Sequence, residues 1–251
     1  MTNLADKLFD IAGRVIVVTG ASRGIGEAIS EGFSSSGANV YGIGRSVTPN
    51  KENTSYKYIN CDINDDLEFK RIIADIFSSE GRIDVLVNAA GISLSSDLEE
   101  DQTSIFLKTI STNLSSSFKC CETVLPCMEA GGYGSIINVT SIGSLMGFAG
   151  NPGYVASKGG LAALTRALAV DFGRNGIRVN NIVPGYFNTK MTQKSYSDPV
   201  ANKLRSGRTI LNRWGEVEEL IGAAIFLASP ASSYVTGTDL VVDGGWTAKG
   251  L

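Results

Sequence analysis

"RVIVVTGASRGIG", residues 14–26, joins a short run of β-branched residues directly to a turn that carries three glycines. Such an apolar run is typical of a strand buried in a parallel sheet. Glycines here allow a tight turn, a close approach of the backbone to a phosphate, and close packing of the next helix. The free N–H groups at the start of that helix favour an anion. The stretch therefore predicts a dinucleotide-binding unit at Gly20, Gly24 and Gly26, although its G-x-x-x-G-x-G spacing differs from the G-x-G-x-x-G fingerprint.

Outward from this unit, strand-like and helix-like segments alternate along the chain. Strand patterns occupy residues 14–19, 39–43, 56–60, 83–89, 135–141, 177–183 and 238–244. Helical periodicity marks Ile25, Ile29 and Phe33, then a stripe of Leu67, Ile72, Ile76 and Phe77, and then residues 102–129, 152–173 and 216–228. The alternation predicts an α/β fold: a single doubly wound Rossmann-type domain over residues 1–251, with a seven-stranded parallel sheet and helices on both faces. Residues 186–213 lack strong periodicity and are expected to form a lid.

The composition narrows the classes of function. The chain has 251 residues, of which 43% are hydrophobic, and a net charge of −3. No basic field therefore attracts nucleic acid or an anionic membrane surface. The first residues lack the basic-then-apolar layout of a secretory signal, and no apolar run reaches the roughly 18 residues that span a bilayer. We expect a soluble, cytoplasmic protein without nucleic-acid or membrane partners.

Histidine is absent from the sequence. Its absence excludes Ser-His-Asp and Cys-His catalysis and histidine-based zinc sites. The cysteines at positions 61, 120, 121 and 127 form no C-x-x-C pair, so we predict buried thiols and no metal site. Acid–base chemistry near neutral pH must then use Tyr, Lys, Asp, Glu or Cys with a shifted pKa.

A tyrosine and a lysine offer such chemistry. Tyr154 and Lys158 lie one helical turn apart in "GYVASKGG" (153–160), so a helix would place them on one face. Taken alone, such a pair is common on the surface of an amphipathic helix. In a chain without histidine, however, the lysine charge would lower the phenol pKa from about 10 toward neutrality and let the tyrosine exchange protons.

The end of the second predicted strand indicates which dinucleotide binds. "YGIGRS" (41–46) offers Arg45 after Gly44 and no acidic residue, and Arg23 in the glycine turn adds a second cation. A carboxylate at this place binds the ribose hydroxyls of NAD, whereas an arginine accepts the 2′-phosphate of NADP. We expect NADP(H) to be preferred, with NAD(H) possible. The alternative is that both arginines are solvated surface residues.

Seven motifs then occur in order along the chain: "TGASRGIG" (19–26), "CDI" (61–63), "NAAG" (88–91), Asn113, Ser141, "YVASK" (154–158) and "PGYFNT" (184–189). From about residue 10 to its C-terminus the chain resembles the classical short-chain dehydrogenase/reductase family. Within that family, "KLFDIAGRVIVVTG" (7–20) and "NRWGEVEELIGAAIFLAS" (212–229) are most similar to gluconate 5-dehydrogenases and related sugar-acid reductases.

The resemblance implies a catalytic set of four residues. Tyr154 would be the general acid that protonates the carbonyl oxygen during reduction. Lys158 would favour the phenolate and bind the nicotinamide ribose. Ser141 would hold the substrate oxygen, and Asn113 would support a proton-relay water to the lysine.

The resemblance also implies contacts to the cofactor. Asp62 and Ile63 would flank the adenine, with Asp62 accepting from its amino group; alternatively, Asp62 caps the helix that begins near residue 65. Members of the family often carry a second asparagine where this chain has Ala89. The full implied set is Gly20, Ser22, Arg23, Gly24, Ile25, Gly26, Arg45, Ser46, Asp62, Ile63, Asn88, Ala90, Gly91, Tyr154, Lys158, Pro184, Gly185, Phe187 and Thr189.

We therefore expect an NADP(H)-dependent oxidoreductase that interconverts a keto group and a secondary alcohol on a small, anionic, hydroxylated substrate such as a sugar acid. The alternatives are a 3-oxoacyl-[acyl-carrier-protein] reductase and a non-catalytic NADP-binding sensor or scaffold. The resemblance also implies a homotetramer, with the helices around 102–129 and 152–173 in one interface. Within the lid, six Lys or Arg residues stand against one Asp, a local charge of +5. These cations are expected either to attract an anionic substrate or to be ordinary solvated surface.

Overall fold

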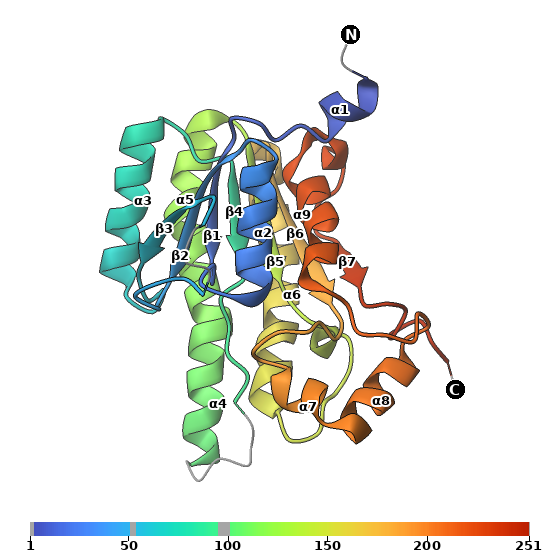
Figure 1. The fold of residues 1–251 in the computed structure, drawn as a ribbon. Coiled ribbons are helices and arrows are strands. Elements are labelled where there is room, and N and C mark those ends of the chain that lie inside the picture. The colour runs from blue at the N-terminus through green and yellow to red at the C-terminus, as the bar shows by residue number, and fades with distance from the viewer. Residues whose placement is uncertain (1–2, 51–53, 95–100, 251) are drawn as a thin grey trace.

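The computed structural model describes residues 3–50, 54–94 and 101–250. Its centre is a seven-stranded parallel sheet in the order β3-β2-β1-β4-β5-β6-β7 (Figure 1). The strands are β1 Val15–Thr19, β2 Asn39–Gly44, β3 Lys57–Asn60, β4 Val85–Asn88, β5 Gly134–Val139, β6 Ile177–Pro184 and β7 Asp239–Val242. All seven predicted strands are present, and the predicted fold class is confirmed.

The strand order reverses between β1 and β4, and this reversal fixes where a ligand can bind. Thr19 at the end of β1 pairs with Ile43 of β2 on one side and with Asn88 of β4 on the other. Connections leave these neighbouring strands in opposite directions, so a crevice opens at their carboxyl ends. The predicted glycine turn follows Thr19 directly and therefore lies at this crevice.

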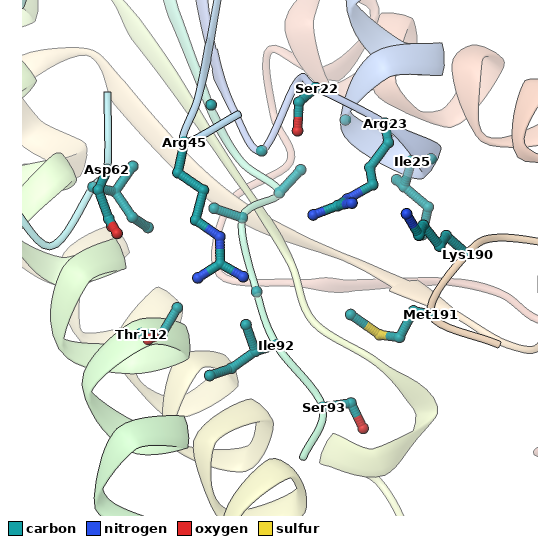
Figure 2. A pocket seen from close by; sticks show the side chains of 18 of the residues that line it. Ser22, Arg23, Ile25, Arg45, Asp62, Ile92, Ser93, Thr112, Lys190 and Met191 are labelled. Carbon is teal, nitrogen blue, oxygen red and sulfur yellow. The ribbon is translucent and has the colours of Figure 1, made fainter. Parts of the chain in front are cut away.

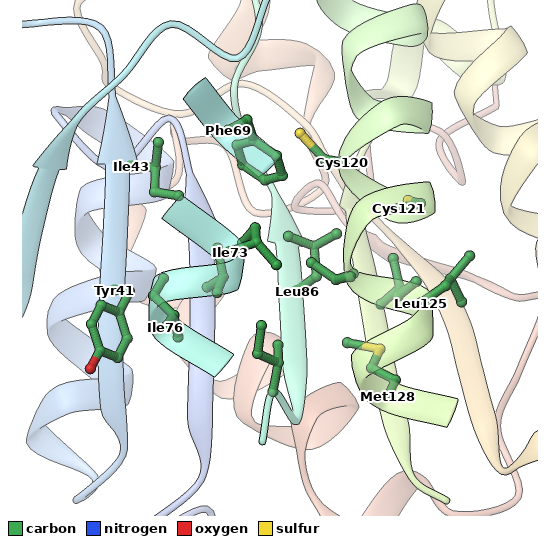
Figure 3. Packing of buried hydrophobic residues seen from close by; sticks show 14 of the residues in the cluster. Tyr41, Ile43, Phe69, Ile73, Ile76, Leu86, Cys120, Cys121, Leu125 and Met128 are labelled. Atoms are coloured by element: carbon green, nitrogen blue, oxygen red, sulfur yellow. The ribbon is translucent and has the colours of Figure 1, made fainter. Parts of the chain in front are cut away.

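Helices cover both faces of the sheet. On one face α2 (Gly24–Ser35) and α9 (Ile221–Ala228) pack over Ile16 and Val18. On the other face α3 (Asp66–Glu80), α5 (Ser116–Gly131) and α6 (Pro152–Phe172) pack over Val15 and Val17. Alternate residues of β1 thus point to opposite cores, as the period of two in a strand requires. Figure 3 shows the second core, in which Phe69 and Ile73 of α3 approach Leu86 and the α5 side chains.

The predicted apolar stripe of α3 is partly wrong. Ile72 and Ile76 are buried as expected, but the side chain of Leu67 is 81% exposed. Phe69 and Ile73 complete the buried face instead. Leu67 lies five positions before Ile72, which places it well off the helical stripe, whereas Phe69 lies three positions before Ile72 and shares its face.

The predicted helix over 102–129 is interrupted. It consists of α4 (Gln102–Ile110), a π-helical turn (Ser111–Ser115) and α5. Single π-helical turns inside α-helices occur frequently at functional sites, and this turn carries Asn113. The predicted helix over 216–228 likewise begins as a 3-10 turn (Val217–Leu220) before it continues as α9.

The expected lid contains two short helices, α7 (Gln193–Ser197) and α8 (Pro199–Arg208), which lie beyond the carboxyl ends of the strands in Figure 1. Asp198 begins α8, because its carboxylate accepts hydrogen bonds from the backbone N–H groups of Val200 (2.9 Å) and Ala201 (3.3 Å). Proline at the first helical position suits this start, since its missing N–H would be unpaired there anyway. The only acid of the lid is therefore engaged as a helix cap.

All four cysteines are free thiols, and Cys61, Cys120 and Cys121 are buried as predicted, whereas Cys127 is half-buried. In the part of the chain that the structure describes, no helix is both long and apolar enough to cross a membrane. Among the same described residues, no group of three His, Cys, Asp or Glu side chains could hold a metal ion. Helix α1 (Leu4–Leu8), which precedes β1, and helix α4, which follows β4, lie at opposite ends of the molecule (Figure 1).

Candidate active site

A cleft of about 420 Å³ opens at the carboxyl ends of β1, β2 and β4 (Figure 2). Its walls come from the glycine turn, the loops after these strands, the π-helical turn and the start of the lid. Residues that were predicted to contact a cofactor and line this cleft are Gly20, Ser22, Arg23, Gly24, Ile25, Gly26, Arg45, Asp62, Ile63, Ala90, Gly91 and Thr189.

The glycine turn has its shape because side chains do not fit there. A Cβ atom on Gly20 would stand 2.6 Å from the backbone nitrogen of Ala90, and Gly20 also has a positive φ of 73°. A Cβ atom on Gly26 would collide with the carbonyl oxygen of Gly20. Glycine at both positions lets the start of α2 approach β4 closely, so the N–H groups of its first turn face the cleft. This arrangement can hold an anion.

Two guanidinium groups extend into the same cleft. Figure 2 shows the side chains of Arg23 and Arg45 entering it from the glycine turn and from the end of β2. Within residues 3–50, 54–94 and 101–250, neither side chain has a hydrogen bond or an ion pair. Two unpaired cations near a helix N-terminus make this end of the cleft suitable for phosphate groups.

Asp62 lies on the wall of the cleft beyond β3. Its Oδ1 accepts hydrogen bonds from the backbone N–H (2.9 Å) and the side-chain amide (2.7 Å) of Asn64. The alternative role of Asp62 as a helix cap is wrong, because Asp65 caps α3 by accepting from the N–H of Glu68 (3.1 Å). The carboxylate of Asp62 faces the cleft in Figure 2.

Asn88 has a different position from the one that was expected. Its side chain is buried in the core, where Nδ2 donates to Oδ1 of Asn138 (2.9 Å), and it does not line the cleft. Asn88 is the last residue of β4. Because its side chain points away from the cleft, Ala90 and Gly91 of the following loop contribute to the wall instead. The orientation follows from the alternation of side chains along the strand.

Four more residues of the implied cofactor set lie off the cleft. The carbonyl of Ser46 accepts from Tyr58 (2.7 Å), and Phe187 is buried with its ring against Gly215. Pro184 and Gly185 end and follow β6, behind the lid. Of the segment 184–189, only Thr189 reaches the wall of the cleft.

Tyr154, Lys158 and Ser141 come together at the carboxyl end of β5. Tyr154 and Lys158 lie one turn apart on α6, with the lysine Nζ 5.8 Å from the centre of the tyrosine ring. The buried ammonium of Lys158 donates to the carbonyl of Val139 (2.7 Å). Ser141, two residues after that carbonyl, lies close enough to the Tyr154 hydroxyl to lower its pKa. The predicted placement of Tyr154 and Lys158 on one helical face is confirmed.

Burial dominates the electrostatics of this group. It raises the pKa of Tyr154 above its usual value, and the Tyr186 phenol raises it further, whereas the hydrogen bond from Ser141 lowers it. Burial also lowers the pKa of Lys158 to about 8. The direction of the tyrosine pKa shift is thus opposite to the one expected, because the cost of removing the phenolate from water outweighs the lowering effect of Ser141.

Asn113 holds the wall of the cleft in place. Its side-chain oxygen accepts from the N–H of Ile92 (2.8 Å), and its Nδ2 donates to the carbonyl of Ile92 (2.8 Å) and to the Ser157 hydroxyl (3.1 Å). A Cβ atom on Gly91 would lie 3.2 Å from the Asn113 oxygen and 3.6 Å from the Lys158 Nζ. The segment 91–92 therefore separates the cleft from Asn113 and Lys158, and the small glycine leaves the ammonium close to the cleft.

Sequence reasoning missed several residues of the wall. Some of these residues could have been predicted from their neighbours in the sequence. Those after "NAAG" continue along the same wall, and Thr112 directly precedes the predicted Asn113. Met191 carries no such signal, because its position depends on how the lid folds. The residues of the wall that lie outside the predicted cofactor set are Gly44, Cys61, Asn64, Ala89, Ile92, Ser93, Leu94, Thr112, Lys190 and Met191.

Comparison with known proteins shows to which family this arrangement of residues belongs. Residues 20–247 match the family model described as enoyl-(acyl carrier protein) reductase. The chain belongs to the short-chain dehydrogenase/reductase family. It is accordingly an oxidoreductase, and the resemblance read from the seven motifs is confirmed.

Three relatives illustrate the range within the family. The gluconate 5-dehydrogenase of Gluconobacter oxydans is 38% identical over 96% of this chain and 98% of its own length. The 3-oxoacyl-[acyl-carrier-protein] reductase of Chlamydia muridarum is 37% identical over 94% of this chain and 98% of its own. The crystal structure of a gluconate 5-dehydrogenase from Burkholderia cenocepacia J2315 in complex with NADP and tartrate has a TM-score of 0.91 at 33% identity, covering 98% of this chain and 100% of that one.

Proposed function

We propose that this chain is an NADP(H)-dependent dehydrogenase that interconverts a keto group and a secondary alcohol on a small, anionic, hydroxylated substrate such as a sugar acid. The observation that carries the proposal is the position of Lys158, one helical turn from Tyr154, next to Gly91 in the wall of a cleft whose two guanidinium groups have no partner among the described residues. A proton donor thus lies next to a site suited to a phosphorylated dinucleotide.

The residues of the cleft fit NADP. The glycine turn forms a cradle that a Cβ atom would fill, and the start of α2 offers N–H groups to a pyrophosphate. Arg23 and Arg45 would hold the 2′-phosphate, Asp62 and Ile63 would flank the adenine, and Lys158 would bind the ribose next to the nicotinamide. The bound nicotinamide would supply the hydride chemistry.

The remaining work falls to the side chains of this chain. Ser141 would bind the substrate oxygen, and Tyr154 would donate its hydroxyl proton to that oxygen during reduction. The raised pKa keeps Tyr154 protonated at neutral pH, which suits a donor. The Lys158 ammonium would stabilise the phenolate that remains after the transfer, and Asn113 would keep Ile92 and Gly91 in the wall.

The choice of a sugar acid as the substrate rests on relatives. The Gluconobacter oxydans relative and the solved Burkholderia cenocepacia structure are both gluconate 5-dehydrogenases. The similarity to the Chlamydia muridarum reductase supports 3-oxoacyl-[acyl-carrier-protein] reduction as the second candidate. A purely binding role, as an NADP sensor, is disfavoured because Asn113, Ser141, Tyr154 and Lys158 are all present.

The proposal is tested by measuring how fast NADPH is oxidised when a candidate keto substrate is reduced. Purified protein would be assayed with NADPH against 5-keto-D-gluconate and against acetoacetyl coenzyme A, with Tyr154→Phe as the matched control. We expect faster turnover of the keto acid, and a loss of about 10²–10⁴-fold in Tyr154→Phe with NADPH binding retained. Preference for the thioester would favour the second candidate. Tyr154→Phe turnover at even a third of the wild-type rate would contradict the role of Tyr154.

We propose further that residues 1–251 form one domain and that the chain is a homotetramer. Apolar side chains on α4, α5 and α6 support this assembly, because Leu107, Phe118 and Val170 are exposed by 59%, 37% and 80%. Sedimentation equilibrium of the wild type and of Val170→Glu tests it. A monomeric wild type would contradict the proposal.

A further inference from the structure

A second group of side chains lies beyond the cleft, against the lid. The ring of Tyr186, just after β6, packs against Trp214 (5.3 Å between centroids) and Trp246 (4.8 Å). Two arginines of α8 cover this aromatic cluster: the guanidinium of Arg205 lies 4.9 Å from the centre of the Tyr186 ring, and that of Arg208 lies 5.2 Å from the centre of the Trp246 ring. Residues three apart on a helix share a face, so both cations face the same cluster.

Two donor groups in this cluster have no acceptor among the described residues. The Nε of Arg205 and the indole Nε1 of Trp246 are buried without a hydrogen-bond partner. In the described ranges, neither Arg205 nor Arg208 has an ion pair with an acidic residue. Buried donors are nearly always satisfied in folded proteins. The unpaired Nε of Arg205 and the unpaired indole N–H of Trp246, with the guanidinium of Arg208 nearby, therefore indicate a place for an external acceptor with negative charge.

The cluster adjoins the reacting groups. Tyr186 and Trp246 pack with Ile142, Met146 and Phe148, which belong to the loop that follows Ser141. Tyr186 is also close enough to Tyr154 for its phenol to raise the pKa of Tyr154. A substrate whose oxygen is held at Ser141 and Tyr154 would therefore extend toward this cluster.

The other cations of the lid have different surroundings. Arg213 forms a two-bond ion pair with Glu219 (2.6 and 2.7 Å) and is thereby neutralised. Lys194 and Lys203 are exposed, and Lys190 lies at the wall of the cofactor cleft. On the side of the reacting groups, the positive charge of the lid thus comes from the partly buried Arg205 and the exposed Arg208, which both lie against aromatic rings.

We propose that Arg205, Arg208 and the indole N–H of Trp246 form an anion subsite that binds the carboxylate of the substrate. This rests on the proposed function, since it assigns the charged end of that substrate. A guanidinium presents parallel N–H groups that match the two oxygens of a carboxylate, which a lysine ammonium does not. The rings of Tyr186 and Trp246 restrain both guanidinium groups by cation–π contact.

Tryptophan fluorescence gives a readout that does not depend on turnover. The chain has two tryptophans, and both contact Tyr186. We would titrate the protein with D-gluconate and with D-glucitol, its uncharged analogue, in the absence of NADP⁺. We expect a saturable change with gluconate and a much weaker response to glucitol. No saturable change with gluconate in the wild type would overturn the subsite.

Variants on one helix provide matched comparisons. Arg205→Gln should weaken gluconate binding about 10- to 150-fold, the range for loss of a charge-assisted contact. Arg205→Lys should recover only part of this loss, because it restores the charge without the planar fork. Lys203→Gln, an exposed cation on the same helix, should bind as the wild type does. Equal losses in Arg205→Gln and Lys203→Gln would overturn the subsite in favour of a general field. Circular dichroism confirms that each variant folds.

The subsite and the proposed function fail in different ways. If the wild type reduces 5-keto-D-gluconate and Arg205→Gln leaves both KM and gluconate binding unchanged, the subsite is wrong and the function stands. If gluconate binds in an Arg205-dependent manner but no keto acid is reduced, the subsite stands and the function is wrong. With both correct, Arg205→Gln raises KM for the keto acid and leaves an uncharged ketone unaffected.

Discussion

The hydroxyl oxygen of Tyr58 lies 2.7 Å from the point where a Cβ atom on Gly44 would stand. The same hydroxyl donates to the carbonyl of Ser46 (2.7 Å), so it is fixed in place. Position 44 ends β2, where a carboxylate would bind the ribose hydroxyls of NAD. In this chain a tyrosine from the neighbouring strand β3 already occupies the space that such a side chain needs. Tyr58 therefore reinforces the preference for NADP that we infer from Arg45 and Arg23.

This relationship determines how cofactor preference can be changed. Gly44→Asp with Arg45→Ser should fold poorly, because the new side chain meets the Tyr58 hydroxyl. Adding Tyr58→Phe removes that oxygen and should restore part of the stability, since the Cβ of Ser22 would still lie 3.1 Å from the new Cβ. The triple variant should then shift the ratio of kcat/KM for NADP⁺ and NAD⁺ toward NAD⁺ by about 10- to 150-fold, since a charge-assisted contact is worth about 1.5–3 kcal/mol.

Thermal melts and steady-state kinetics of the double and triple variants check this prediction. Tyr58→Phe alone is the control and should keep the preference of the wild type. A double variant as stable as the wild type would show that Tyr58 moves aside at little cost. An unchanged cofactor ratio in a folded triple variant would show that position 44 does not face the adenosine ribose.

The direction of the Tyr154 pKa shift predicts a pH dependence. Oxidation of an alcohol requires Tyr154 as a phenolate, and burial raises its pKa above the usual value of about 10. The phenolate fraction, and with it kcat/KM for oxidation of D-gluconate, should therefore rise about tenfold per pH unit between pH 6 and 8. Reduction uses the protonated phenol and should stay flat over this range. A plateau of the oxidation rate below pH 8 would instead indicate a pKa lowered toward neutrality.

The sequence was sufficient to predict the sheet and the residues that precede or follow its strands. Runs such as "RVIVVT" signal a buried strand by composition alone, and the glycines of the following turn have a steric role that no other residue type can take. The spacing of Tyr154 and Lys158 likewise determines their shared face on α6. Local patterns of this kind depend only on neighbours in the chain.

Other features depend on contacts that no local pattern encodes. Asn88 was expected at the cleft, but Asn138 on the adjacent strand pairs with its amide and keeps it in the core. The lid shows no periodicity, yet Arg205 and Arg208 acquire a shared role because Tyr186 and Trp246 come to lie beneath them from distant parts of the chain. The pKa of Tyr154 depends on burial, which the spacing of residues does not reveal.

Replacement of Asn113 should reveal its contribution to the wall of the cleft. Asn113→Leu leaves the N–H and the carbonyl of Ile92 without partners, and each unpaired buried group costs about 1–3 kcal/mol. We expect a decrease of about 2–6 kcal/mol in the free energy of unfolding, measured by urea denaturation. Ser157→Ala removes only the bond to the Asn113 amide and should cost about 1 kcal/mol. Equal effects of the two variants would contradict an anchoring role for Asn113.

Lys158, which the proposed activity requires, should lower the stability of the folded protein. Burial lowers its pKa from 10.5 to about 8, which corresponds to a cost of roughly 3 kcal/mol for keeping the ammonium charged in the folded protein. This cost is fully present below pH 8, where the lysine is protonated in both states. Between pH 8 and 10.5 the unfolded chain binds more protons than the folded one, so the stability of the wild type rises with pH in that window.

Lys158→Met retains the length of the side chain and removes the charge. Losing the hydrogen bond to Val139 costs about 1 kcal/mol, which offsets part of the roughly 3 kcal/mol gained by removing the buried charge. The variant should therefore be more stable than the wild type by roughly 2 kcal/mol at pH 7, and it should be inactive. The difference should shrink as the pH rises from 8 to 10. Urea denaturation at pH 7 and pH 9.5 measures both quantities, with the exposed Lys203→Met as a control that should show neither effect. A Lys158→Met variant no more stable than the wild type at pH 7 would mean that water reaches the ammonium and that burial does not set its pKa.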